Sequence, residues 1–251
     1  MKAHARILVL LLALAMLLSA CGSQEPSGGE PEVKDTLIVG NSAEPTVLDP
    51  PNQQNTPAGL INVQVYDGLL RQNNETGEIE PCLAESWEYV DDCTVRFHLR
   101  DDVYFHDGSK FTAEDVKFTF DRGAECIMKA MIFEPFDTSK TKIIDEYTIE
   151  LGTKDVFPPF LTYLTNNATL IVSKSAVEAA GSDDVYGRNP VGTGAYKFVE
   201  WIAGDRVVLE RNEEYWGELP EFKNLIIRTI ADDTTRGMAL ESGEIDIAVG
   251  L

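Results

Sequence analysis

The chain has 251 residues, with 21 lysines and arginines against 42 aspartates and glutamates, so its formal net charge at pH 7 is −21. A charge of this sign disfavours binding to nucleic acid, whose phosphates need lysine and arginine, and adsorption to anionic lipid headgroups. We interpret it as a solvated acidic surface on a soluble body.

The first twenty residues have the pattern of an export signal. Lys2 and Arg6 precede an apolar run of about 12 residues, 7–18, which is too short to span a bilayer as a stable helix. The segment LSACG (18–22) then looks like a bacterial lipobox. This resemblance implies that residues 1–20 are a lipoprotein signal peptide and that Cys21 becomes a lipid-bearing N-terminus. The alternative is an ordinary secretory signal with an accidental cysteine.

A polar segment follows the cysteine. Residues 22–32 are rich in glycine, proline, serine and glutamate and contain no apolar side chain, so residues 21–35 are predicted to form a flexible tether. No later segment reaches about 18 consecutive apolar residues, so no further membrane span is expected. The body of about 215 residues that remains is long enough for one large domain or two modest ones.

The first half of the body alternates predicted strands, turns and helices. Residues 36–40 form an apolar run that ends in glycine and predicts a buried strand, and three prolines make residues 41–51 a loop. Apolar spacing predicts a helix over residues 58–68. Val95, Phe97 and Leu99 alternate with polar residues, which predicts a half-buried strand paired with residues 85–90 through a turn at 91–93.

The stretch FHLRDDVYFHDGSKFTAEDV (97–116) contains two histidines and several acidic and basic residues, which could suggest a catalytic site, but we interpret it as structural. His106 and Asp107 could be a catalytic pair or metal ligands. A metal site usually needs three or four ligands, however, and the predicted mature chain has only His98 and His106. Thr112 fits a helix N-cap with Asp115 as the capping-box partner, and Phe111 and Val116 are spaced for a hydrophobic staple.

The second half of the body continues the same alternation. It predicts strands over residues 143–151, 196–199, 207–211, 225–230 and 245–249, and helices over 173–180 and 232–242, the latter capped by Gly243. Residues 191–195 form a glycine-rich loop, but no Walker loop or GxGxxG motif is present, so a phosphate site is not expected. Interleaved strands and helices predict the α/β class.

Three cysteines follow Cys21. Cys82 and Cys93 could form a disulfide in an exported protein, and the alternative is that Cys82, Cys93 and Cys126 are free thiols. No CxxC motif is present, so neither a zinc site nor a redox site is expected, and no cofactor is predicted.

Several segments in a fixed order resemble the extracytoplasmic solute-binding proteins of family 5, the peptide/nickel type of ABC importer. They are VGNSAEPTVLDP (39–50), YDGLL (66–70), TGEIEPCLAESW (76–87), FHLR (97–100), FHDGSKFTAEDV (105–116), PVGTGAYKF (190–198), RNEEYWG (211–217) and SGEIDI (242–247). The resemblance implies a periplasmic-binding-protein-like type II lobe with an inserted α+β subdomain. It places the lobe at residues 36–60 and 185–251 and the subdomain at 61–184.

Members of this family are usually about twice as long as this chain, so the resemblance also implies a chain truncated before the second lobe of a two-lobed trap. It points to the loop after Pro50 as ligand-binding, with Gln53, Gln54, Asn55 and Thr56 offering polar groups suited to a peptide. Gly192, Thr193 and Gly194 are further candidates, although the two glycines could merely satisfy turn geometry. Tyr215 and Trp216 are expected to pack the lobe.

The resemblance implies a substrate-binding lipoprotein that captures extracellular oligopeptides, or a related solute, and delivers them to the permease of an ABC importer without catalysing a reaction. Relatives that bind nickel chelates, haem or oligosaccharides leave the solute open. A surface-anchored sensing or adhesion lipoprotein of the same fold is an alternative. A hydrolase with paired carboxylates is the third hypothesis, but no nucleophile motif accompanies the acidic residues.

Overall fold

The computed structural model describes residues 34–53, 55–126 and 130–250. The predicted signal peptide 1–20, the lipidation residue Cys21 and nearly all of the predicted tether 21–35 lie outside these residues. Among the residues described, no helix is both long and apolar enough to cross a bilayer.

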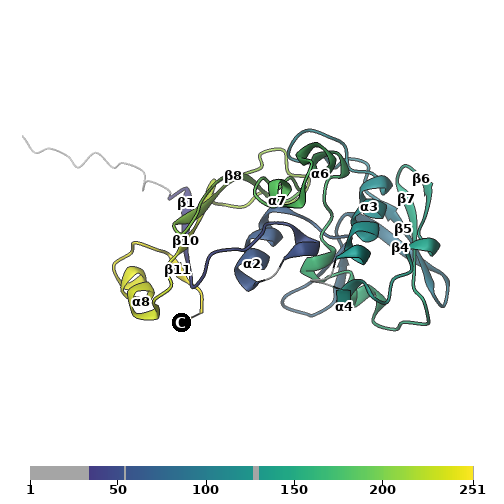
Figure 1. Cartoon of the computed structure of the whole chain (residues 1–251), viewed down its shortest axis with the longest axis horizontal. Coiled ribbons are helices and arrows are strands. Elements are labelled where there is room, and N and C mark those ends of the chain that lie inside the picture. The colour runs from purple at the N-terminus through teal and green to yellow at the C-terminus, as the bar shows by residue number, and fades with distance from the viewer. Residues whose placement is uncertain (1–33, 54, 127–129, 251) are drawn as a thin grey trace, which may run out of the picture. The chain divides into compact units, whose positions relative to one another are not determined.

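The largest sheet joins segments from both ends of the compact unit Asp35–Leu251 (Figure 1). Its strands are β1 (Thr36–Asn41), β8 (Tyr196–Ile202), β9 (Arg206–Arg211), β10 (Asn224–Thr229) and β11 (Ile247–Ala248), in the order β11-β1-β10-β9-β8. β1 is parallel to β10 and to β11, whereas β9 is antiparallel to both β10 and β8. The four longer strands confirm the predictions, and β11 is shorter than the predicted strand 245–249.

A second, antiparallel sheet lies within the middle of the chain. It contains β4 (Ala84–Asp91), β5 (Thr94–Leu99), β6 (Lys142–Asp145) and β7 (Thr148–Gly152), in the order β4-β5-β7-β6. Val95, Phe97 and Leu99 of β5 are buried and His98 is exposed, which confirms the predicted alternation. The edge strand β4 is different, because every residue from 85 to 91 except the partly buried Trp87 is exposed. A short hairpin of β2 (Leu70–Gln72) and β3 (Ile79–Pro81) precedes this sheet.

The prediction of one strand over residues 143–151 is wrong. The segment is a hairpin in which β6 and β7 pair with each other. The turn forms because the Asp145 carboxylate accepts a hydrogen bond from the backbone N–H of Tyr147 at 2.9 Å, which is the local bond by which aspartate favours turns.

Most helices begin at the caps that the sequence supplies. α3 (Ala113–Glu125) starts at Thr112, whose backbone N–H donates to Asp115 at 3.0 Å, and this confirms the predicted capping box. Ser173 caps α6 (Lys174–Ala180) and Asp232 caps α8 (Asp233–Glu241). The other short helices are α4 (Ala130–Phe133), α5 (Phe160–Tyr163) and α7 (Asp183–Tyr186), with 3-10 turns at Pro50–Asn52, Thr138–Lys140 and Asn167–Thr169.

The helix predicted over residues 58–68 is shifted towards the N-terminus. α2 covers Thr56–Val65, because Asn55 caps it and Pro57 occupies a position near its start that tolerates proline. Tyr66 is already extended, and the orphan carbonyl of Val65 accepts a hydrogen bond from Gly194 N–H at 2.9 Å. Leu69 and Leu70, which follow the predicted helix end, pack with the four-stranded sheet.

Two apolar clusters make up the core. One fills the space around the four-stranded sheet and α3, with Phe97, Phe120 and Phe160 among its fully buried rings. The other joins the five-stranded sheet to α2 and includes Ile61 and Val65. These α2 residues belong to the predicted inserted subdomain 61–184, but they pack with the sheet of the predicted lobe. The domain boundaries themselves stay a prediction.

The three cysteines of the body are free thiols. Cys82 is buried, and burial raises the pKa of its thiol to about 12, so it remains protonated at neutral pH. The structure therefore favours the free-thiol alternative over a Cys82–Cys93 disulfide.

Candidate functional site

The first group of predicted ligand-binding residues lies at the N-terminal end of α2. Gln53 is buried, and its carbonyl oxygen accepts a hydrogen bond from Asn62 Nδ2 at 3.2 Å. The Asn55 side chain accepts from Ala58 N–H at 3.2 Å and donates to Glu44 O at 2.9 Å. Thr56 is exposed, and Gln54 lies outside the described residues. Among Gln53, Asn55 and Thr56, the three candidates that the structure describes, only Thr56 has an exposed side chain that a solute could contact.

The second group, residues 192–194, is buried against the other end of the same helix. A Cβ atom on Gly192 would lie 2.0 Å from Val65 O, and one on Gly194 would lie 2.6 Å from Gln64 O. Only glycine allows this approach of the loop to α2. The two predicted groups are thus separated by the length of a ten-residue helix, about 15 Å, and the structure does not bring them together.

Thr193 belongs to a network around a partly buried carboxylate, Asp67, that the sequence analysis did not single out. Its hydroxyl donates to Asp67 at 2.9 Å. Trp216 Nε1 donates to the same carboxylate at 3.1 Å and Tyr215 Oη at 3.2 Å. Burial raises the pKa of Asp67, although the hydrogen bonds from these donors oppose the shift. Tyr215 and Trp216 hold this junction between α2 and the residues after β9.

His106 fixes the glycine-rich loop from the other side. Its Nε2 lies 2.9 Å from Gly194 O, and its Nδ1 accepts from Gly192 N–H at 3.4 Å, so the two bonds together assign the proton to Nε2. Burial lowers the pKa of His106 to about 4, so the ring is neutral at pH 7. In the described part of the chain, no group of three or more His, Cys, Asp or Glu residues could hold a metal ion.

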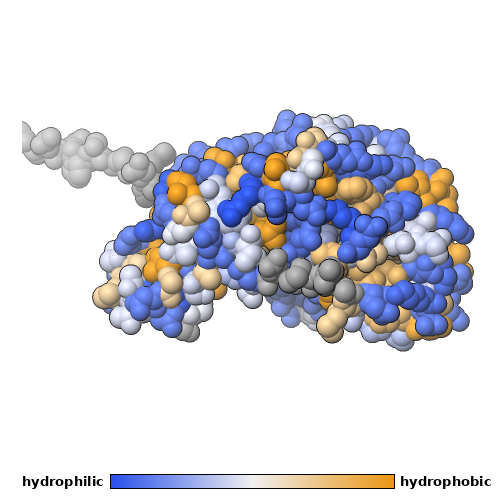
Figure 2. Space-filling view, viewed as in Figure 1, coloured by the Kyte–Doolittle hydropathy of each residue, from blue (hydrophilic) through white to orange (hydrophobic). Residues whose placement is uncertain are grey.

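The most distinctive polar arrangement lies where the parallel strands end. Open α/β sheets bind ligands outside the carboxyl ends of their strands. β1 ends at Asn41, β10 at Thr229 and β11 at Ala248. We define the strand-end surface as residues 41–44, 230–232 and 249–250. Ser42 and Ala43 are exposed on it, and Figure 2 shows the molecule hollowed between α8 and the region of α2.

A buried arginine ties these strand ends together. The Arg236 side chain is completely buried, and its guanidinium donates to Ile230 O at 2.6 Å and also to Gly250 O. Its aliphatic part lies so close to β1 that a Cβ atom on Gly40 would come within 3.3 Å of Arg236 Cγ. The same guanidinium pairs with Asp233 at 2.6 Å. Arg236 therefore holds the ends of β10 and β11 in place and puts a positive charge beneath them.

Two buried donors at these strand ends lack a partner among the residues that the structure describes. They are Asn41 Nδ2 and Arg236 Nε. A buried donor without an acceptor costs about 1–3 kcal/mol, and an ordered water is the usual acceptor for such a group. The sequence analysis missed both residues. Arg236 shares the buried face of α8 with Ala239, and a charged residue on such a face is the signal that could have drawn attention to it.

The predicted residue Asn55 contributes to this surface indirectly. It holds the loop after β1 through Glu44 O and through Thr46 N–H, the latter at 3.4 Å. The Glu44 carboxylate in turn accepts from Trp201 Nε1 at 2.8 Å. Residues 42–46 are therefore tied to both α2 and β8, and the strand-end surface is a pre-formed structure.

Comparison with known proteins gives a consistent picture. Residues 78–251 match the model of the bacterial extracellular solute-binding proteins, family 5 middle region. The periplasmic oligopeptide-binding protein OppA of Escherichia coli K12 is 30% identical over 96% of this chain and 48% of its own length. The glutathione-binding protein GsiB of Escherichia coli O157:H7 is 31% identical over 84% of this chain and 41% of its own. The chain thus spans less than half the length of these relatives.

Solved structures agree. The periplasmic binding protein DppA of Helicobacter pylori, in complex with the peptide STSA, superposes with a TM-score of 0.76 at 29% identity, covering 84% of this chain and 45% of that protein. NikZ of Campylobacter jejuni, in complex with Ni(L-His), superposes with a TM-score of 0.75 at 29% identity. The match covers 86% of this chain and 43% of that protein. These matches confirm the predicted α/β fold of the periplasmic-binding-protein type II kind. The chain belongs to family 5 of the bacterial extracellular solute-binding proteins.

Proposed function

We propose that the protein captures an extracellular oligopeptide, or a related small solute, at the strand-end surface and delivers it to the permease of an ABC importer. The family match over residues 78–251 carries this proposal. The relatives OppA and GsiB are described as binding oligopeptides and glutathione, both of which are rich in carbonyl oxygens. Asn41 Nδ2 and Arg236 Nε lie buried beneath this surface without an acceptor among the described residues, so a solute oxygen would reach them through an ordered water.

We expect peptide capture to depend on free access to the strand-end surface. Dialysis of the full chain against pools of two- to five-residue peptides, followed by mass spectrometry, should show selective retention. Ala43→Trp fills the exposed surface beside Asn41 without disturbing a buried contact, and should weaken retention at least about tenfold. Glu75→Trp, in the exposed β2–β3 turn, is the matched control and should retain peptides like the parent.

Two results would count against capture at this surface. One is the absence of retention of any peptide, saccharide or metal chelate, and the other is equal retention by the Ala43→Trp variant. Delivery is tested separately, by uptake of a retained peptide into cells that carry the permease but lack their own binding protein. Retention without uptake would favour a sensing role.

We further propose that the body is attached to the membrane through Cys21. The proposal rests on the LSACG segment and on the polar residues that follow it. Cys21→Ala should move the protein from the membrane fraction to the soluble extracytoplasmic fraction and abolish its labelling by radioactive palmitate. Cys82→Ala is the control and should stay labelled. Membrane association and labelling that survive Cys21→Ala would contradict the anchor.

A further inference from the structure

A polar cavity lies between the loop that follows β1 and the segment around α7. Its volume is about 480 Å³, which is within the range of small-molecule sites, and its lining includes Thr46, Val47, Asn52, Asp184, Gly187 and Arg188. The two walls meet because Leu48 N–H donates to Gly187 O at 2.9 Å. A Cβ atom on Gly187 would lie 2.2 Å from Val47 Cγ2, so glycine is required at this junction.

The cavity presents an arginine whose charge is not matched. The Arg188 guanidinium carbon lies 3.5 Å from the ring centroid of Trp201, so the plane of the group is held against the indole. The indole is itself held by Glu44 at 2.8 Å. Within residues 34–53, 55–126 and 130–250, the guanidinium makes no ion pair. A stacked guanidinium keeps its N–H edge free, and that edge matches a carboxylate in a bidentate geometry.

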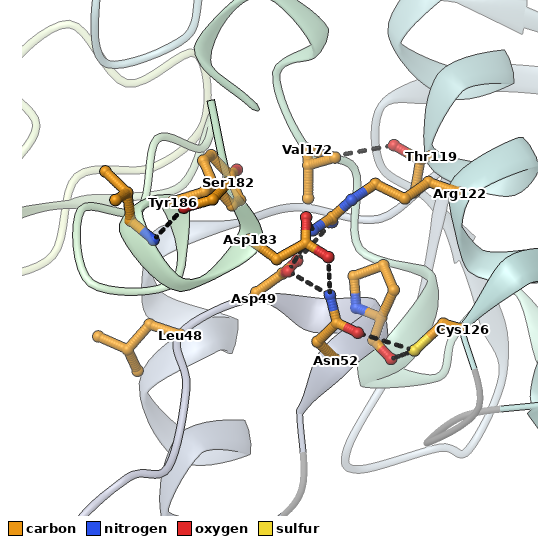
Figure 3. Close-up of polar contacts among 12 residues, drawn as sticks. Leu48, Asp49, Asn52, Thr119, Arg122, Cys126, Val172, Ser182, Asp183 and Tyr186 are labelled. Atoms are coloured by element: carbon orange, nitrogen blue, oxygen red, sulfur yellow. Dashed lines mark hydrogen bonds and ion pairs between the residues drawn. The ribbon is translucent and has the colours of Figure 1, made fainter. Parts of the chain in front are cut away.

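Carboxylates line the same cavity and are only partly neutralised. Arg122 Nη2 pairs with Asp183 at 2.6 Å, but the same guanidinium already holds Asp49 through bonds of 2.8 and 2.6 Å (Figure 3). One cation is thus shared by two anions. The exposed Asp184 side chain, next in sequence, has no ion-pair or hydrogen-bond partner among the described residues. The cavity therefore offers an unmatched positive group and an excess of negative charge.

We propose that this cavity is a second solute site, distinct from the strand-end surface, and that it takes a small zwitterion such as a free α-amino acid. The solute carboxylate binds the N–H edge of Arg188, and the solute ammonium lies by Asp184 and Asp183. A simple anion is disfavoured by the two carboxylates, and a simple cation leaves Arg188 unmatched. The proposal does not depend on peptide capture.

Trp201 provides a local reporter for this site. The full chain, labelled with nitrogen-15, should be titrated with L-alanine while the indole N–H resonances of the three tryptophans are followed. We expect a saturable shift of the Trp201 resonance and no shift of Trp87 or Trp216. Acetate and methylammonium, which each carry half of the charge pattern, should bind at least about tenfold more weakly than L-alanine.

Substitutions in the cavity complete the test. Arg188→Gln and Asp184→Asn should each weaken L-alanine binding at least about tenfold, measured also by equilibrium dialysis so that the readout does not depend on Trp201. Arg71→Gln removes another exposed arginine, on β2, and should leave binding unchanged. Ala43→Trp should leave it unchanged as well, which separates this site from the strand-end surface. Because Arg188 and Asp184 are exposed, both variants should fold like the parent, and Arg188→Gln should lose only the small stabilisation from its contact with Trp201.

Three outcomes would overturn the proposal. They are a Trp201 resonance that does not respond to L-alanine, an Arg188→Gln variant that binds L-alanine as tightly as the parent, and acetate binding as tight as that of L-alanine. The last result would identify a plain anion site.

Discussion

Replacing Arg122 with alanine should lower the free energy of unfolding by about 3–5 kcal/mol, because the buried carboxylate of Asp49 would lose the cation that it pairs with. The Asp49 side chain is fully buried, and Arg122, itself only 13% exposed, donates both of its forked bonds to it. Burial alone would lower the pKa of Arg122, but the carboxylates of Asp49 and Asp183 outweigh it and raise the pKa, so the guanidinium stays charged at any practical pH. Figure 3 shows how the pair links α3 to the loop before α2 and to α7.

Urea unfolding followed by circular dichroism measures this loss. Lys117→Ala, on the same helix, breaks the exposed i,i+4 pair with Asp121 and should cost less than about 0.5 kcal/mol. The double variant Arg122→Ala/Asp49→Asn should recover part of the loss, since it removes the stranded charge. A loss below about 1 kcal/mol for Arg122→Ala would show that Asp49 does not need its partner.

Acidification should weaken the fold through His106. The pKa of His106 is about 4 in the folded chain, below its ordinary value of 6.5, because burial and the nearby Lys197 disfavour the charged ring. The unfolded chain therefore takes up the proton first. The contribution of His106 to stability is complete above about pH 6.5 and is lost as the pH falls towards 4. Between pH 7 and 5 the loss amounts to about 2 kcal/mol.

The matched variant for this effect is His106→Gln. Glutamine has one donor and one acceptor for Gly194 O and Gly192 N–H but no titrating group in this range. The stability of the parent should fall about 2 kcal/mol more than that of His106→Gln between pH 7 and 5, measured by urea unfolding at each pH. His98→Gln, on the exposed face of β5, should follow the parent. Parallel pH profiles for the parent and His106→Gln would refute the assignment.

Local patterns predicted the elements whose stabilising contacts are close in sequence. The capping box of Thr112 and Asp115 lies within one helical turn, and the alternation of β5 follows directly from its period of two. The end of α2 was not predictable in this way. It depends on Gly192 and Gly194, which pack on Val65 from more than a hundred residues further along the chain. The β6–β7 turn was missed because apolar residues on both sides of Asp145 masked a turn signal.

The candidate site was less accessible to sequence reasoning than the fold. Ordered motifs indicated the family, but the strand-end surface arises only when β1 pairs in parallel with β10 and β11, which lie far away in sequence. Periodicity cannot reveal which strand ends meet. Asn55 was predicted to contact a ligand, and it caps α2 and holds the loop beside the strand-end surface. Whether the predicted residues contact a solute stays a prediction.

The bare edge of β4 has a consequence for how copies of the protein meet. Its outer backbone groups form no strand pair in the described structure, and an open edge of this kind is a template for joining a second molecule. Glu85, Glu88 and Asp91 are exposed along it, and of these Glu88 is paired with Arg96 at 3.0 Å. Two such edges brought together would face each other with like charges at close range. We therefore expect electrostatic repulsion to oppose edge-to-edge pairing of two copies, and this repulsion to weaken where salt screens the carboxylates or acid protonates them.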